Sequence, residues 1–350
     1  MKSACFLTVD MGSQSIRTAL VSDELEVLAV HSDPQQITSY PDGNRIEVNM
    51  PFAWESVKKG CRKVLEESCV PPRSVKAVCT GAIMHCPVPI DRRGNLLLDD
   101  VQIYSDKRCK KYVDAFAKED YSEDGYEKTG SVTATSWLGF KIRWIKEHQS
   151  QIYRDTWKFL PANAWLNYQL TGVAAIDHTE ASGTYLVNRH TGTYDPELAA
   201  CMGVDLDKMP PIFRSDEVIG KVSEAAAQAT GLPAGICVVA GSGDMGCAAL
   251  GGNLDSGNGI ITTGTASGAD MYYHQPVMDT RLINLRHVID GWLSFGSVDC
   301  CGGSMRWLKG ALFPGQEQEW KRQGGDLNRE IDAIASKVKP GADGLLYLPQ

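Results

Sequence analysis

Residues 5–22 read CFLTVDMGSQSIRTALVS, a stretch in which two apolar runs flank a short turn of small and polar residues. The runs at 5–9 and 16–21 predict two strands joined by that turn, and a further run at 26–30 predicts a third strand. Residues 259–273, GIITTGTASGADMYY, repeat the order of strand, small-residue turn and strand. Two such units suit a nucleotide held between two similar lobes, although two ordinary hairpins would show the same pattern.

The rest of the chain alternates predicted helices with predicted strands. Apolar residues recur at helical spacing over 52–68, 137–148 and 162–170. A buried type of strand is predicted at 75–79, and the mixture of elements predicts an α/β fold. With 350 residues, the chain exceeds the roughly 250–300 at which one hydrophobic core stops growing, so we expect two domains. A stretch rich in Gly and Ala at 231–252 places the boundary near it.

Composition excludes several classes of protein. The 35 Lys and Arg residues against 43 Asp and Glu residues give a net charge of −8, which does not suit a nucleic-acid-binding surface. No apolar run approaches the roughly 18 residues that a membrane span needs, so we expect a soluble, cytoplasmic protein without a membrane partner. The 11 cysteines form no CxxC pair, which argues against a disulfide framework and a zinc site.

The first turn carries residues that suit a phosphate. Asp10 ends the predicted strand, and Gly12 lets a ligand approach the backbone. The donors that follow are Ser13, Gln14, Ser15 and Arg17. Such a turn suits phosphate oxygens, and the carboxylate beside it suits Mg²⁺ or its waters. A strand-ending Asp-x-Gly is also an ordinary turn, and the missing GxxxxGK[ST] pattern argues against a P-loop enzyme.

A second carboxylate stands in VVAGSGDMGCAALGG, residues 238–252. Asp244 follows a predicted strand at 236–240 and a Gly-Ser-Gly turn, and it precedes a stretch that could open a helix. A carboxylate framed by glycines at this kind of junction is well placed to take a proton from a substrate hydroxyl. The alternative is that Asp244 is simply a helix cap.

Three further segments offer ligand contacts. Met84 and His85 follow the strand at 75–79, and open α/β sheets bind ligands where their strands end. His85 could donate to a sugar oxygen while Met84 packs on the carbon face, or His85 could be a satisfied structural group. Asp106 lies in YSDKR, which alternatively forms a solvated charge cluster. Gly302 opens a Gly-rich helix start that can accept a phosphate or a flat ring.

Taken in order, the segments resemble the FGGY family of carbohydrate kinases. They are DMGSQSIR (10–17), IMHCPVPIDRRGNLLLDDVQIYSDKR (83–108), PANAWLNYQLTG (161–172), SGDMGCAALG (242–251), TTGTASG (262–268), GGSMRWL (302–308) and GADGLLYLP (341–349). The resemblance implies a ribonuclease H-like, actin-like ATPase fold of two lobes. Residues 1–242 would form the sugar-binding lobe and 243–350 the start of the nucleotide-binding lobe. Family members continue for about 100–200 residues more, so the second lobe is expected to be incomplete in this chain.

The resemblance also implies a role for each matching residue. Asp244 would be the general base, and Asp10 would hold Mg²⁺ through water. The sugar contacts would be Met84, His85, Asp106, Ser136 and Trp137. The nucleotide contacts would be Gly12, Ser13, Gln14, Ser15, Arg17, Gly264, Thr265 and Gly302.

The expected activity is ATP-dependent phosphorylation of a sugar hydroxyl, with a homodimer as one compatible assembly. Xylulokinase-like members show Met-His at the position of Met84 and His85, whereas glycerol-kinase-like members show Arg-Glu, so a ketopentose such as xylulose is favoured. Many members have Gln at Ile83 and Gly at Cys86, which leaves the sugar open. The alternatives are a kinase for another ketose or polyol, a non-catalytic actin-like nucleotide switch, and a degenerate member that binds sugar without phosphorylating it.

Overall fold

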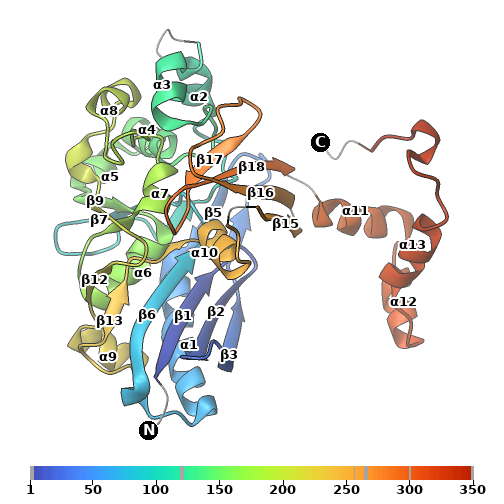
Figure 1. Cartoon of the computed structure of the whole chain (residues 1–350), viewed down its shortest axis with the longest axis horizontal. Coiled ribbons are helices and arrows are strands. Elements are labelled where there is room, and N and C mark those ends of the chain that lie inside the picture. The colour runs from blue at the N-terminus through green and yellow to red at the C-terminus, as the bar shows by residue number, and fades with distance from the viewer. Residues whose placement is uncertain (1–3, 119–121, 256, 264–266, 299–300, 348–350) are drawn as a thin grey trace. The chain divides into compact units, whose positions relative to one another are not determined.

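The computed structural model describes residues 4–118, 122–255, 257–263, 267–298 and 301–347 (Figure 1). Contacts divide the chain into two compact units. The larger combines Met1–Ser256 with Tyr272–Ser294, and the smaller combines Gly257–Met271 with Phe295–Gln350. This division does not test the predicted lobe boundary between residues 242 and 243, which stays a prediction.

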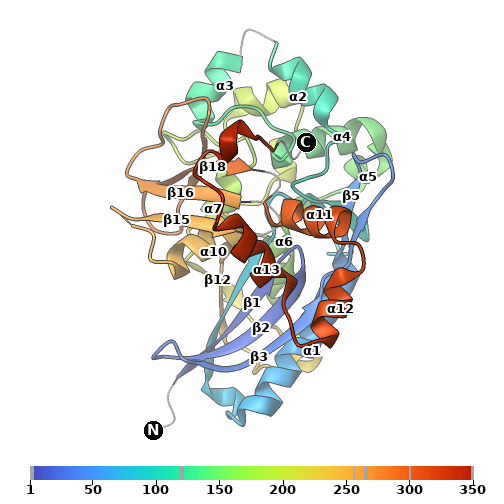
Figure 2. The same ribbon diagram turned by 90° about the vertical axis from the view of Figure 1, so that its right-hand side faces the viewer.

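Within the described residues, the larger unit contains a mixed sheet of seven strands. The strands are β1 (Cys5–Met11), β2 (Ser15–Ser22), β3 (Val27–Pro34), β6 (Val75–Ala82), β12 (Val218–Lys221), β13 (Cys237–Val239) and β14 (Ser242–Gly243). Their order is β12-β13-β6-β1-β2-β3, and β14 also pairs with β6. β6 runs parallel to β1, β13 and β14. β1, β2 and β3 form an antiparallel meander (Figure 2). The α/β class and the first four predicted strands are confirmed.

The first long helix, α1 (Met50–Ser68), packs on this sheet beside β2 and β3. Asn49 caps its start, because its side chain accepts a hydrogen bond from the N–H of Phe52 at 2.9 Å. The buried positions Ala53, Val57, Cys61 and Val64 recur at helical spacing. Gly60 allows the close approach, since a Cβ there would lie 2.3 Å from Thr18 Oγ1. This interface is part of the main hydrophobic core.

Two helices predicted at 137–148 and 162–170 are confirmed as α4 (Leu138–His148) and α6 (Ala162–Thr171). α6 packs against β6, where the hydroxyl of Thr80 donates to Asn167 Oδ1 at 2.9 Å. The short helix α7 (His178–Ser182) follows, and α10 (Asp244–Gly251) begins directly after β14. These helices and strand ends position the site described below.

Further elements complete the larger unit. They are β4 (Ile37–Ser39), β5 (Ile46–Asn49), η1 (Pro72–Ser74), β7 (Val88–Ile90), β8 (Asp100–Gln102), α2 (Lys110–Phe116), α3 (Ser122–Thr129), α5 (Ser150–Asp155), β9 (Lys158–Leu160), β10 (Ile176–Asp177), α8 (Pro196–Met202), η2 (Leu206–Lys208), β11 (Ile212–Phe213), α9 (Glu224–Thr230) and β17 (Ile283–Arg286).

The second predicted pair of strands lies mainly in the smaller unit. β15 (Gly259–Thr263) pairs antiparallel with β16 (Ser267–Tyr273), which confirms the strands at this place. After β18 (Trp292–Val298) come α11 (Gly302–Leu312), α12 (Gln316–Arg322), α13 (Leu327–Ala335) and η3 (Ala342–Gly344). Across both units, the described part of the chain contains no helix with the length and apolar character needed to cross a bilayer.

Candidate active site

The ends of three parallel strands bring the predicted site residues together at one edge of the sheet. In the strand register, Asp10 of β1 and Ser242 of β14 both lie opposite Gly81 of β6. Because partners in a sheet share a face, these positions lie on the same side of it. Asp244 comes two residues after Ser242, and Met84 comes three residues after Gly81. The strand ends therefore gather two carboxylates and the start of the predicted sugar-binding stretch.

The first turn is short and tied at both ends. The N–H of Gly12 donates to the carbonyl of Ser15 at 2.9 Å, and Gln35 of the following segment bonds to the carbonyls of Gly12 and Gln14. Asp10 and Arg17 are register partners, and they form an ion pair at 3.1 Å. Both side chains are about half exposed, so the pair contributes little to stability and can open for a ligand.

Asp244 has the electrostatics expected of a base. It is the first residue of α10, and its Oδ1 accepts a hydrogen bond from the N–H of Met245 at 2.9 Å. Gly243 occupies the cap position, so the alternative that Asp244 is the helix cap is wrong. Burial raises the pKa of Asp244 to about 7, and the negative charge of Asp10 adds to the rise. A carboxyl with this pKa can exchange a proton near neutral pH.

Met84 packs directly against the strand that leads to Asp244. A Cβ on Gly243 would lie 2.4 Å from Met84 Cγ and 2.7 Å from its Sδ. The glycine at this position therefore makes room for the methionine side chain. Met84 is buried, and its contact with Gly243 holds it next to the start of α10.

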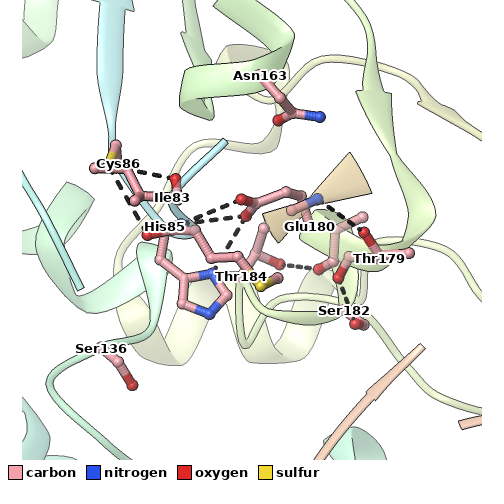
Figure 3. A network of polar contacts seen from close by, with 12 residues as sticks. Ile83, His85, Cys86, Ser136, Asn163, Thr179, Glu180, Ser182 and Thr184 are labelled. Atoms are coloured by element: carbon pink, nitrogen blue, oxygen red, sulfur yellow. Dashed lines mark hydrogen bonds and ion pairs between the residues drawn. The ribbon is translucent and has the colours of Figure 1, made fainter. Parts of the chain in front are cut away.

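His85 is buried in a polar network (Figure 3). Its backbone N–H and its Nδ1 both bond to the carboxylate of Glu180, and Nδ1 lies 3.2 Å from Oε2. The ring packs on Gly183, where a Cβ would lie 2.0 Å from its Cε1, and its centroid is 5.4 Å from that of Trp137. Burial lowers the pKa of His85, and the Lys141 ammonium lowers it further. The imidazole is therefore neutral at pH 7.

The segment before α4 forms a neighbouring wall. The indole N–H of Trp137 donates to the carbonyl of Val132 at 2.8 Å, which fixes the ring against His85. The carbonyl of Ser136 accepts a hydrogen bond from Lys141 Nζ at 2.7 Å. The predicted pair Ser136 and Trp137 is thus placed beside His85, and its contact with sugar stays a prediction.

Asp106 has a different environment from the other predicted residues. It is fully buried, and its oxygens accept hydrogen bonds from the N–H of Ile46 at 2.9 Å and of Arg108 at 3.0 Å. The guanidinium of Arg108 also bonds to it and reaches Glu47 at 2.7 Å. The alternative of a solvated charge cluster is therefore wrong. These contacts tie the segment to β5, and direct binding of sugar by Asp106 stays a prediction.

Three further predicted nucleotide contacts are Gly264, Thr265 and Gly302. Gly264 and Thr265 lie outside the described residues. Gly302 is the first residue of α11 in the smaller unit, as expected for the start of a helix. Their roles stay predictions.

Two residues of this region were missed by the sequence interpretation. Lys141 and Glu180 are fully buried beside His85. Lys141 shares the apolar stripe of α4 with Leu138 and Ile145, and a lysine within such a stripe is a signal of a buried charge. Glu180 stands three residues after Asp177, the cap of α7, where a glutamate usually reaches back to the cap N–H. That spacing predicts a local capping box, and it gives no indication that Glu180 contacts His85.

Comparison with known proteins identifies the family. The autoinducer-2 kinase of Escherichia coli is 27% identical over 97% of this chain, which spans 65% of that protein's length. The probable L-xylulose kinase of Pasteurella multocida is 24% identical over 98% of the chain and 70% of its own length. The crystal structure of xylulose kinase from Rhodospirillum rubrum matches 99% of the chain and 69% of its own, with a TM-score of 0.87 and 25% identity.

These matches confirm the ribonuclease H-like, actin-like ATPase fold that the sequence predicts. The model of the FGGY family of carbohydrate kinases, N-terminal domain, matches residues 5–251. This match covers more than half of the sequence and includes Asp10, Met84, His85 and Asp244. The chain therefore belongs to the FGGY family of carbohydrate kinases.

Proposed function

We propose that this protein transfers the γ-phosphoryl group of ATP to a hydroxyl of a small sugar, with a ketopentose such as xylulose as the favoured acceptor. The observation that carries the proposal is that Asp244, with its pKa of about 7, follows a strand that ends at the same sheet edge as Asp10, with Met84 packed against Gly243. Relatives named as kinases for autoinducer-2 and L-xylulose support this class of reaction. A cytoplasmic location, where ATP and sugars are both available, belongs to the same proposal.

Asp244 would act on the acceptor hydroxyl. Its carboxylate takes the hydroxyl proton while the oxygen forms a bond to the γ-phosphorus, and the bond from that phosphorus to the bridging oxygen of ADP breaks. The products are the sugar phosphate, ADP and a protonated Asp244, which then returns its proton to solvent. Positioning and charge stabilisation do most of the work in phosphoryl transfer, and the base contributes about 10²–10⁴-fold.

The first turn fits a nucleotide phosphate and a hydrated cation. Gly12 leaves the backbone accessible, and the half-exposed Arg17 offers a positive charge. Asp10 would hold Mg²⁺ through water, because Mg²⁺ gives up its waters reluctantly and is usually bound by only one or two carboxylates. When bound, the cation would neutralise charge on the transferred phosphoryl group.

The sugar side combines an apolar and a polar contact. Met84 offers a thioether surface to the carbon face of a sugar, and His85 offers a ring nitrogen to a hydroxyl. Because the ring of His85 is neutral, its binding to an uncharged sugar costs no desolvation of a charge. This arrangement favours a neutral polyhydroxyl acceptor over a strongly anionic one.

A panel of acceptors tests the proposed function. We expect ADP release from ATP and Mg²⁺ to depend on the added sugar, with the highest kcat/KM for a ketopentose among ketopentoses, ketohexoses and polyols. ADP release without acceptor should be slow. Sugar binding by calorimetry without turnover would instead support the degenerate sugar binder, and fast sugar-independent hydrolysis would support the nucleotide switch. A preferred ketohexose or polyol would replace the ketopentose and leave the kinase in place.

Gly243→Ala should weaken sugar binding selectively. The φ of −59° and ψ of 156° at Gly243 suit alanine, so the change acts through the collision of the new Cβ with Met84. Overpacking of this kind typically costs 1–3 kcal/mol, so we expect the KM for sugar to rise about tenfold. Steady-state kinetics with varied sugar and varied ATP measure the effect.

The matched control is Gly251→Ala at the other end of α10, where a Cβ would meet no atom within 4 Å. We expect this variant to keep both KM values. An unchanged sugar KM in Gly243→Ala would show that Met84 does not contact the acceptor.

A further inference from the structure

His85 is surrounded by ionisable side chains that the proposed mechanism does not use. Lys141 on α4 and Glu180 on α7 are both fully buried, and both bond to this one residue. Lys141 is 56 positions away from His85 in the sequence and Glu180 is 95 positions away. Two ionisable side chains brought from distant segments to one histidine indicate a specific positioning device.

The backbone of His85 needs such support. Its φ of 66° lies in the left-handed region, which a residue with a side chain seldom adopts without compensation. Its N–H donates to both carboxylate oxygens of Glu180 at 3.3 Å, and its carbonyl accepts from Lys141 Nζ at 2.9 Å. Both backbone polar groups of the strained residue are therefore held by ionisable side chains.

The same carboxylate also fixes the ring. Nδ1 lies 3.2 Å from Glu180 Oε2, and Figure 3 shows the other ring nitrogen pointing away from Glu180. Among the described residues, no side chain or backbone group hydrogen-bonds to that second nitrogen, Nε2. Glu180 thus leaves Nε2 as the ring atom that is available to a ligand.

Lys141 also bonds to the segment before α4. Its Nζ donates to the carbonyl of Ser136 at 2.7 Å as well as to that of His85. The lysine therefore cross-links the segment of Met84 and His85 to the segment of Ser136 and Trp137. Lys141 sits on the core-facing stripe of α4, so a packed apolar side chain would suffice there for stability alone.

Burying these ionisable side chains lowers the stability of the fold, so a gain in stability does not explain why they are there. Burial lowers the pKa of Lys141 to about 8, and burial together with Asp177 raises the pKa of Glu180. Asp177 accepts hydrogen bonds from the hydroxyl and N–H of Thr179, the N–H of Glu180 and the side chain of Asn163, so it belongs to the same buried network. Buried ionisable groups of this kind are costly relative to packed apolar side chains.

We infer that Lys141 and Glu180 are positioning residues that hold His85 in its left-handed conformation with Nε2 turned to the acceptor sugar. This inference rests on the proposed function for the identity of the ligand. It adds two residues that do not touch substrate but determine how well the histidine binds it. Its direct consequence is that loss of either residue acts on the sugar and spares the nucleotide.

The test uses the apolar, similarly sized variants Glu180→Met and Lys141→Met. Each removes the hydrogen bonds to His85 while keeping the volume of the side chain. We expect the KM for sugar to rise about 10- to 100-fold in each, which corresponds to the loss of hydrogen bonds to charged groups, while the KM for ATP stays within about twofold. Glu180→Gln, which keeps an acceptor oxygen, should lie between wild type and Glu180→Met.

Lys146→Met is the matched control. Lys146 lies on the same helix and donates to the carbonyl of Gly203 at 2.8 Å, away from His85. This variant should leave both KM values unchanged. If Lys141→Met and Glu180→Met change kcat and both KM values together, or leave the sugar KM unaltered, the positioning role is wrong.

A second measurement separates this inference from the proposed function. Nitrogen NMR of the ligand-free protein should show His85 as one fixed neutral tautomer, with widely separated ring nitrogen shifts. Glu180→Gln should weaken that separation, and Glu180→Met should average the two shifts, as in a free imidazole. Averaged shifts in wild type would overturn the inference whatever the substrate is. A fixed tautomer without any sugar phosphorylation would reject the kinase proposal alone.

Discussion

Asp244→Asn should lower kcat by about 10²–10⁴-fold while sugar binding is retained, because the amide cannot accept the hydroxyl proton. The substitution keeps the shape of the side chain and an oxygen that can accept from the N–H of Met245. Local structure at the start of α10 should therefore survive. A coupled assay of ADP release measures turnover, and calorimetry with the sugar alone measures binding.

The control for this prediction is a carboxylate outside the site. Asp216 is exposed and paired with Arg214, so Asp216→Asn should retain wild-type turnover. Turnover by Asp244→Asn close to that of wild type would remove Asp244 from the role of base. A loss of sugar binding equal to the loss of turnover would instead assign it to substrate binding.

The sequence predicts the sheet edge well because the relevant information is local. Apolar runs of strand length define β1 and β6, and the glycines around Asp244 mark the junction between β14 and α10. Parallel strands place their carboxyl ends together, so residues that directly follow such strands converge at one edge of the sheet. This is why Asp10, Met84 and Asp244, each singled out by its own local pattern, lie at the same edge of the sheet.

The surroundings of His85 could not be predicted in the same way. Glu180 has a local role that its spacing from Asp177 suggests, yet its carboxylate bonds to a residue 95 positions away. The left-handed backbone of His85 gives only a weak signal, because histidine is enriched in this region but most histidines still avoid it. Asp106 shows the opposite error, because the cluster YSDKR suggests a solvated surface, yet the Asp106 side chain is buried while the neighbouring Tyr104 is exposed. The surroundings of His85 and Asp106 depend on hydrogen bonds between polar groups that are far apart in the sequence.

The second large effect is the dependence of activity on pH. The pKa of Asp244 is about 7, and a base works only when it is deprotonated, so kcat/KM should fall as pH decreases through 7. With one such group, kcat/KM should fall about 10-fold at pH 6 and about 100-fold at pH 5 relative to the plateau above pH 8. An unperturbed aspartate would instead keep full activity down to about pH 5. A flat profile between pH 5 and pH 8 would contradict the raised pKa.

The pH dependence of thermal stability reports the titration of Asp244 in the absence of substrate. A carboxyl whose pKa rises from 3.8 in the unfolded chain to about 7 in the fold favours the native state most when it is protonated. Its contribution is fully present below about pH 4 and is lost as pH rises through 7. Asp244→Asn does not titrate, so its Tm relative to wild type should increase from pH 4 to pH 7 and then level off, by a few degrees. A Tm difference independent of pH would contradict this.

Asp10→Asn identifies how much of the raised pKa comes from the neighbouring charge. Burial is the larger cause of the raised pKa of Asp244, and the charge of Asp10 is a smaller cause. Removing that charge should therefore shift the pH dependence of Tm that comes from Asp244 to lower pH, without returning the pKa to 3.8. The measurement avoids turnover, which Asp10→Asn would also affect if Asp10 holds the hydrated cation. A transition that stays in place would show that the two carboxylates are too far apart to interact. Asp10 of β1 and Ser242 of β14 are both register partners of the same residue of β6. We therefore expect the Asp10→Asn substitution to lower the pKa of Asp244.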